Sequence, residues 1–129
     1  VIKKYNATPC NSVEEVLEKA DFVSIHCPGG ESTYHLMNKE RIGMMKKGAG
    51  IINAARGGVI DETALMFALD KHKLAYAGLD VFDNEPNPSI HICMHNAISL
   101  TPHIGGATLE AQQRIEVELA DQITEYFEK

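Results

Sequence analysis

The sequence has no long hydrophobic run and few basic residues, and each shortage excludes a class of protein. No apolar stretch reaches the roughly 18 residues that a membrane-spanning helix needs. With 12 basic against 18 acidic residues the net charge is −6, and basic pairs occur only at Lys3-Lys4 and Lys46-Lys47. We therefore expect no nucleic-acid partner. A basic segment followed by an apolar one is also missing, so we expect no signal peptide.

Cysteine is scarce as well. Cys10, Cys27 and Cys93 are odd in number and lack C-x-x-C spacing, which predicts reduced thiols in a cytoplasmic protein and no metal site. A length of 129 residues with 44% apolar and 23% charged side chains suits one globular domain. The first residue is Val1 rather than Met, which leaves open a processed precursor, a cloned segment or an excised part of a longer chain.

Short apolar segments that are typical of buried strands recur along the chain. They lie at 21–26, 50–54, 76–81 and 97–100, with a further short candidate at 7–10. Because helical segments separate them, the pattern predicts βαβ units in a mostly parallel sheet of about four strands, with helices covering both faces. The fold class is therefore α/β, as a partial Rossmann-like domain.

The helices have recognisable N-terminal signals. Ser12 is expected to cap the first helix, with Glu15 completing a capping box. Asn38 and Asp61 are expected to cap the next two, the first of which should end at Lys47-Gly48. A long last helix is predicted from about Thr108, with apolar residues at a spacing of four: Ala111, Ile115, Leu119, Ile123 and Phe127.

Unusual residues follow the predicted strands, at the edge where parallel sheets bind ligands. Arg56 precedes Gly57-Gly58, and its guanidinium can hold a carboxylate through two hydrogen bonds. Glu85 precedes Pro86 in an acidic loop, and His103 is a candidate general base. Taken singly, each residue could instead be an ordinary surface side chain.

In combination these three residues indicate chemistry. An arginine, a glutamate and a histidine at three strand ends of one sheet can converge on one crevice. Arg56 would fix a carboxylate, His103 would move a proton to or from the substrate oxygen, and Glu85 would orient the imidazole. That set suits a small hydroxy or keto acid, whose oxidation or reduction also needs a hydride carrier.

Four strings carry a family resemblance: ADFVSIHCP, INAARGGVIDETAL, AGLDVFDNEP and TPHIGGATLEAQ. In this order and spacing they resemble the NAD-dependent D-2-hydroxyacid dehydrogenases, with the last string most similar to the D-3-phosphoglycerate dehydrogenase branch of serine biosynthesis. The resemblance implies that Arg56 binds the substrate carboxylate, that Glu85 pairs with the histidine, and that His103 is the catalytic acid and base. A formate dehydrogenase relative is disfavoured, because a glutamine is expected there in place of Glu85.

The resemblance also implies a cofactor site for NAD, with NADP as the alternative. The residues expected to contact the cofactor are Cys27, Ala54, Ala55, Arg56, Asp80, His103, Ile104, Gly105 and Gly106. A small hydroxy or keto acid is the expected substrate. A homodimer is the expected oligomer, since the family usually dimerises through its nucleotide-binding domain.

The sequence departs from the family in one respect: it has no G-x-G-x-x-G phosphate-binding pattern. We therefore interpret residues 1–106 as the second half of a dinucleotide-binding domain, and 107–129 as a helix that would cross to an absent substrate domain. Such a chain is expected to be inactive alone. The alternative is a non-catalytic half-Rossmann folding or interaction module that self-associates through an open strand edge at 22–26 or through the last helix.

Overall fold

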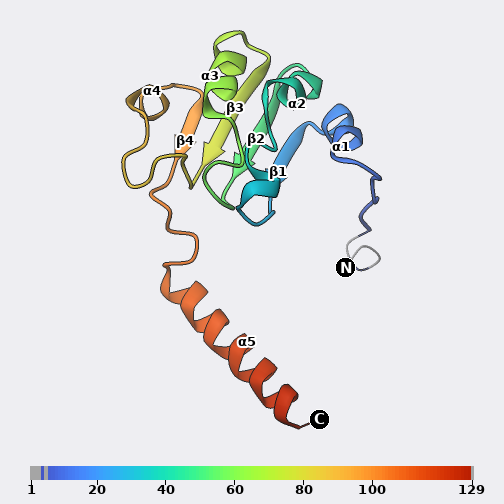
Figure 1. Cartoon of the computed structure of the whole chain (residues 1–129), viewed down its shortest axis with the longest axis vertical. Helices are drawn as coiled ribbons and strands as arrows, with labels where there is room; N and C mark the ends of the chain where they lie inside the picture. The colour runs from blue at the N-terminus through green and yellow to red at the C-terminus, as the bar shows by residue number, and fades with distance from the viewer. Residues whose placement is uncertain (1–3, 5, 129) are drawn as a thin grey trace.

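The computed structural model describes residue 4 and residues 6–128, and it contains one sheet with flanking helices (Figure 1). The strands are β1 (Phe22–Ile25), β2 (Ala49–Asn53), β3 (Leu74–Leu79) and β4 (Ile98–Leu100). The helices are α1 (Val13–Lys19), the 3-10 helix η1 (Glu31–Thr33), α2 (Lys39–Met44), α3 (Glu62–Asp70), α4 (Ile90–Cys93) and α5 (Leu109–Phe127). The predicted α/β class with a long last helix is confirmed.

All strand pairs are parallel, and the strands lie in the order β1-β2-β3-β4. Each strand is therefore the neighbour of the next one in sequence. β1 lies at one edge of the sheet, as predicted, with one side of its backbone not paired to a strand of the described chain. The carboxyl ends of all four strands meet at one edge, which brings the four predicted polar segments to the same side of the domain.

In the described part of the chain the helices cover one face of the sheet, and not both faces as predicted. Residues Ile25, Ile51, Ala77 and Leu79 point to one face and are buried with the helices in a single core cluster. The alternate residues on the opposite face are largely exposed, as Phe22 is at 61%. The strand order steps in the same direction at each crossover, and crossovers between parallel strands are as a rule right-handed, so the connecting helices gather on one side.

Side-chain caps start the helices where the sequence predicts them. The side chains of Ser12, Asn38 and Asp61 each accept a hydrogen bond from the backbone N–H three residues later, and Thr108 does the same for α5. The capping box is only half formed, because the Glu15 carboxylate accepts from the N–H of Asn11 rather than from that of Ser12.

The structure corrects two local predictions and shows one short α-helix that was not predicted. Residues 7–10 form no strand and pair with no strand of the sheet. Helix α2 ends at Met44, before the predicted Lys47-Gly48, because Met45 leaves the helical conformation. The short helix α4 was not predicted, since four residues are too few to show a helical period.

Helix α5 leaves the sheet and extends away from it (Figure 1). Its predicted apolar residues after Ala111 are half or more exposed, which confirms that the helix has no packing partner within the described chain. None of the helices in residues 4 and 6–128 combines the length and apolarity that crossing a bilayer requires.

Candidate active site

The loop after β2 carries Arg56, and a buried asparagine holds that loop. Asn53, the last residue of β2, donates from Nδ2 to the backbone oxygen of Arg56 at 2.9 Å and accepts at Oδ1 from the N–H of Ala55 at 3.1 Å. The Arg56 guanidinium is exposed and donates to the Ala55 oxygen at 2.6 Å. We did not single out Asn53 from the sequence, although a polar residue ending an apolar strand is a usable signal.

The loop after β2 also presses against the loop after β3. A Cβ on Gly57 would lie 1.8 Å from the backbone oxygen of Phe82, so only glycine fits there. The Asp83 carboxylate accepts from the N–H of Gly58 at 2.8 Å, and Glu62 at the start of α3 accepts from the N–H of Asp83 at 2.9 Å. These contacts join the loop of Arg56 to the loop of Glu85.

Burial and the neighbouring Asp83 set the pKa of Glu62 in this junction. Burial raises the pKa of Glu62, and the neighbouring Asp83 carboxylate raises it further, although the hydrogen bond from the Asp83 N–H acts in the opposite direction. Neither residue was predicted to matter, because their contact joins the start of α3 to a loop 21 residues later in sequence.

His103 and Glu85 form the predicted pair. The His103 Nδ1 lies 2.6 Å from Glu85 Oε2, and the other oxygen, Oε1, accepts from the N–H of Phe82 at 2.9 Å. The hydrogen bond from His103, followed by that from Phe82, holds the pKa of Glu85 below its usual value. An ionised Glu85 can only accept, so His103 donates from Nδ1 and its Nε2 is left for other partners. The φ of His103 is +55°, in the left-handed region that few residues other than glycine adopt.

Asp80 clamps the loop that carries His103. Its buried carboxylate accepts at Oδ1 from the Thr101 hydroxyl at 2.5 Å and the Ile104 N–H at 3.1 Å, and at Oδ2 from the Gly105 N–H at 3.2 Å. Burial by itself would raise the pKa of Asp80, but these hydrogen bonds outweigh it and lower the pKa below its usual value.

The three predicted catalytic side chains line one open hollow of about 490 Å³. Arg56 contributes from the loop after β2, Glu85 from the loop after β3 and His103 from the loop after β4. A second hollow of about 310 Å³ is lined by Cys27, 54–56 and their neighbours at the ends of β1 and β2. Ile104 and Gly105 are held by Asp80, whereas Gly106 is exposed and lines neither hollow.

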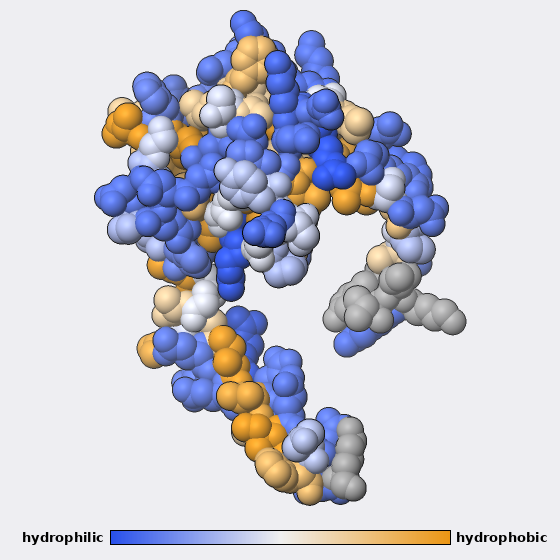
Figure 2. All heavy atoms as spheres, in the orientation of Figure 1, coloured by the Kyte–Doolittle hydropathy of each residue, from blue (hydrophilic) through white to orange (hydrophobic). Residues whose placement is uncertain are grey.

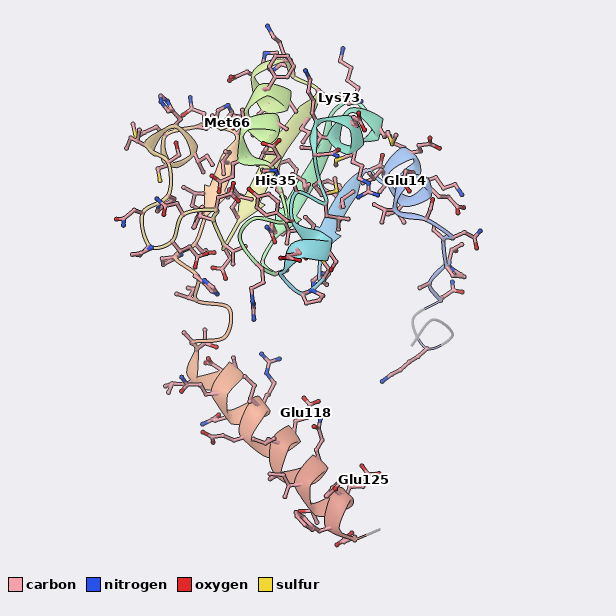
Figure 3. The ribbon with its side chains drawn as sticks, viewed as in Figure 1. Glu14, His35, Met66, Lys73, Glu118 and Glu125 are labelled. Carbon is pink, nitrogen blue, oxygen red and sulfur yellow. The ribbon has the colours of Figure 1, made fainter. Side chains whose placement is uncertain are left out.

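Two aromatic residues beside the first hollow were not predicted as site residues. Tyr34 lines the hollow, and its ring stacks on that of His35 at a centroid distance of 3.9 Å. The His35 N–H donates to the Gly58 oxygen at 2.7 Å, which places the ring among the helices (Figure 3). Its Nε2 is buried without a hydrogen-bond partner in the described part of the chain. We predicted a structural or solvated role for His35, and sequence offered no signal for the stacking.

The low pKa values of Asp80 and Glu85 predict a loss of stability in acid. Their folded pKa values lie below the ordinary 3.8 and 4.5, so their stabilisation is present above those values and is lost as the pH falls through the lower folded values. We expect urea denaturation between pH 3 and pH 7 to show this loss. Glu85→Gln removes one of these two groups, so its free energy of unfolding should fall less with decreasing pH than that of Glu40→Gln, which changes an exposed glutamate. The same decline in both variants would contradict the prediction.

A family model matches residues 2–105, and it is the D-isomer specific 2-hydroxyacid dehydrogenase, NAD binding domain. The chain therefore belongs to the D-isomer specific 2-hydroxyacid dehydrogenase family. It is 44% identical over 113 residues to D-3-phosphoglycerate dehydrogenase 3, chloroplastic, of Arabidopsis thaliana, covering 87% of this chain and 19% of that protein. It is 50% identical over 104 residues to the glyoxylate reductase of Thermofilum pendens, covering 80% of this chain and 31% of that protein.

Solved structures agree with the family. The D-mandelate dehydrogenase of Rhodotorula graminis has a TM-score of 0.84 and 38% identity, covering 89% of this chain and 33% of that chain. A D-isomer specific 2-hydroxyacid dehydrogenase of Xanthobacter autotrophicus, in complex with NADPH and MES, has a TM-score of 0.68 and 38% identity. The match covers 71% of the present chain and 30% of that chain. The present chain thus spans about a third or less of each of these relatives.

Proposed function

We propose that this chain is the segment of a D-2-hydroxyacid dehydrogenase that holds the substrate carboxylate and the proton-transfer pair. The observation that carries the proposal is the hollow in which Arg56, Glu85 and His103 meet, with the glutamate and the histidine 2.6 Å apart. Family membership supports it, since the relatives above are named as dehydrogenases and reductases.

Each side chain has a distinct task in this proposal. The Arg56 guanidinium binds the substrate carboxylate through paired, charge-assisted hydrogen bonds. His103 uses Nε2 to take the proton of the substrate hydroxyl during oxidation and to return it during reduction of the keto acid. Glu85 accepts from Nδ1, which holds the imidazole in one orientation.

The residues around the second hollow fit a dinucleotide. Cys27 and 54–56 line this hollow, and Asp80 and 103–106 follow the neighbouring strands. Together they would hold the nicotinamide side of the dinucleotide, because small side chains and glycines leave backbone accessible at the strand ends. A bound nicotinamide dinucleotide supplies or accepts the hydride. NAD is the proposed cofactor, and NADP is the alternative that the NADPH complex of the Xanthobacter relative supports.

The proposed substrate is a small D-2-hydroxy acid or its keto acid, with a 3-phosphoglycerate-like acid as the finer assignment. The last motif, TPHIGGATLEAQ, favours that branch, whereas other relatives are named for glyoxylate or D-mandelate. The chain alone is proposed to be inactive, since the phosphate-binding pattern is not in this sequence. Residues 107–129 are proposed to cross to a substrate domain, in a cytoplasmic homodimer.

Calorimetric titration with glyoxylate, the smallest 2-oxo acid, in the presence of NADH tests the carboxylate site. We expect binding that Arg56→Ala weakens about tenfold or more, the loss of a charge-assisted pair being worth roughly 1.5–3 kcal/mol. Arg114→Ala removes a guanidinium from α5, far from the hollow, and should leave the affinity unchanged. An equal loss of affinity in both variants would contradict the proposal. So would a parent chain that melts cooperatively but binds no glyoxylate up to about millimolar concentration.

The second candidate function is the non-catalytic interaction module. The specific observations that favour it are the open edge at β1 and the exposed apolar face of α5. Apolar surface of this extent on a small domain is typical of protein interfaces. A folded chain that fails to bind glyoxylate and NADH would support this candidate.

A further inference from the structure

A smaller hollow adjoins the hollow of about 490 Å³ in which Arg56, Glu85 and His103 meet. This side hollow has a volume of about 310 Å³ and is lined mostly by apolar atoms, from residues of the segments 30–34 and 57–59. The two hollows share three lining residues, which are Tyr34, Gly57 and Gly58. Of these three only Tyr34 has a side chain, so its ring forms the boundary between the two hollows.

The tyrosine ring lies over bare backbone. A Cβ built on Gly58 would lie 3.4 Å from Cδ2 and 3.5 Å from Cε2 of Tyr34, so the ring leaves room for little more than the hydrogen of that glycine. The φ of Gly58 is +76°, which favours glycine, and Gly57 has no space for a Cβ beside the Phe82 oxygen. The floor that joins the two hollows is therefore backbone, and the Tyr34 ring determines how far each hollow extends.

The ring is held in this place although it is 66% exposed. Before it in the chain, the Thr33 hydroxyl donates to the backbone oxygen of Pro28 at 2.7 Å. After it, the His35 N–H donates to the backbone oxygen of Gly58 at 2.7 Å. The rings of Tyr34 and His35 also stack, with an angle of 16° between their planes. Contacts on both sides of Tyr34 thus keep its ring at the boundary.

The proposed function leaves one group of the substrate to meet this ring. The reacting carbon of a 2-oxo acid carries a carboxylate, a carbonyl oxygen and a third substituent. Arg56 binds the first and His103 faces the second. Beyond Arg56 and the proton-transfer pair, the lining consists of three glycines, Phe82, Asp83 and Tyr34. Phe82 is buried, and the Asp83 carboxylate is hydrogen-bonded to a backbone N–H of the loop after β2, so Tyr34 is the large exposed side chain that limits the third substituent.

We propose that Tyr34 is a specificity-determining residue, whose ring restricts this site to 2-oxo acids and D-2-hydroxy acids with a narrow third substituent. An aromatic substituent directed toward the side hollow would overlap the tyrosine ring, and such a clash is an effective way to reject a substrate. The inference rests on the proposed function, because the direction of the third substituent follows from the carboxylate at Arg56.

Calorimetric titration of the full chain with glyoxylate and with phenylpyruvate, each in the presence of NADH, is the test. The third substituent is a hydrogen in glyoxylate and a benzyl group in phenylpyruvate, whose aromatic ring is nearly the size of the one in tyrosine. Tyr34→Ala removes the boundary, so the benzyl group can enter the apolar side hollow. We expect the association constant of phenylpyruvate, divided by that of glyoxylate, to rise about tenfold or more, as burial of an aromatic ring predicts.

Two control variants separate the ring from other causes. Tyr34→Phe keeps the ring and loses only the hydroxyl, so it should keep the ratio of the parent chain. Tyr126→Ala removes an equally large exposed ring from α5, which extends away from the domain that carries the hollows (Figures 1 and 2). This variant should also keep the parent ratio. Circular dichroism checks that every variant folds.

The outcomes distinguish the specificity of Tyr34 from the proposed function. Glyoxylate binding by the parent chain reports on the Arg56 site alone. If the parent binds glyoxylate and a folded Tyr34→Ala variant keeps the parent ratio, the role of Tyr34 is overturned and the proposed function stands. An equal rise of the ratio in Tyr34→Phe or Tyr126→Ala also overturns it. If neither the parent nor Tyr34→Ala binds either acid, both proposals fail.

Discussion

Replacing Gly57 by alanine is expected to destabilise the fold by about 3 kcal/mol or more. The new Cβ would lie 1.8 Å from the carbonyl oxygen of Phe82 and 2.6 Å from its carbon. Both atoms are backbone and cannot rotate away, so the two loops must separate. Urea denaturation would measure the change as a lower midpoint.

Gly43→Ala is the matched control for this prediction. Gly43 lies inside α2, and a Cβ there meets nothing within 4 Å. Alanine should therefore stabilise the protein by roughly 0.5–1 kcal/mol through its higher helix propensity. A Gly57→Ala variant as stable as the parent would show that the loops after β2 and β3 are not in contact.

Replacing Asp80 by asparagine is expected to cost about 2 kcal/mol and to release the loop that carries His103. The carboxylate accepts three hydrogen bonds, from Thr101, Ile104 and Gly105. An amide retains one oxygen and turns a donor toward one of these donors, which leaves a buried N–H or O–H without a partner. Hydrogen exchange at the backbone of Ile104 and Gly105 should accelerate together with the loss of stability.

Asp21→Asn is the control for Asp80→Asn. Asp21 is exposed and pairs with Lys46 at 2.9 Å, and surface ion pairs contribute at most about 1 kcal/mol. The control should leave exchange at residues 104 and 105 unchanged. If exchange there is equally slow in Asp80→Asn and in the parent, Asp80 does not clamp the loop.

Local features of the fold could be predicted from the sequence because their causes lie within a few residues. The caps at Ser12, Asn38 and Asp61 are single side chains that accept from an N–H three positions away. The strands were found because uninterrupted apolar segments between turn residues are typical of buried parallel strands. The short helix α4 was not predicted, because four residues are too few to show a helical period.

The sequence pointed to the side chains of the candidate site, but not to the contacts that hold their loops in place. Arg56, Glu85 and His103 could be singled out because each follows a strand and has chemistry that a core does not need. Much of the support comes from Asp80 and Asp83, whose hydrogen-bond partners belong to different loops. Such contacts depend on how the strands are arranged in space, so no sequence spacing predicts them.

The sequence by itself determined the order of the four strands and the longer helices, the polar side chains at the strand ends and the membership in a dehydrogenase family. The tertiary structure alone decided that the helices cover one face of the sheet, because crossovers that step in one direction all fall on the same side. It also decided that Gly57 touches Phe82 and that Asp80 clamps residues 101–105. Those contacts join residues 25 and 21–25 positions apart in sequence, and only the assembled sheet brings them close together.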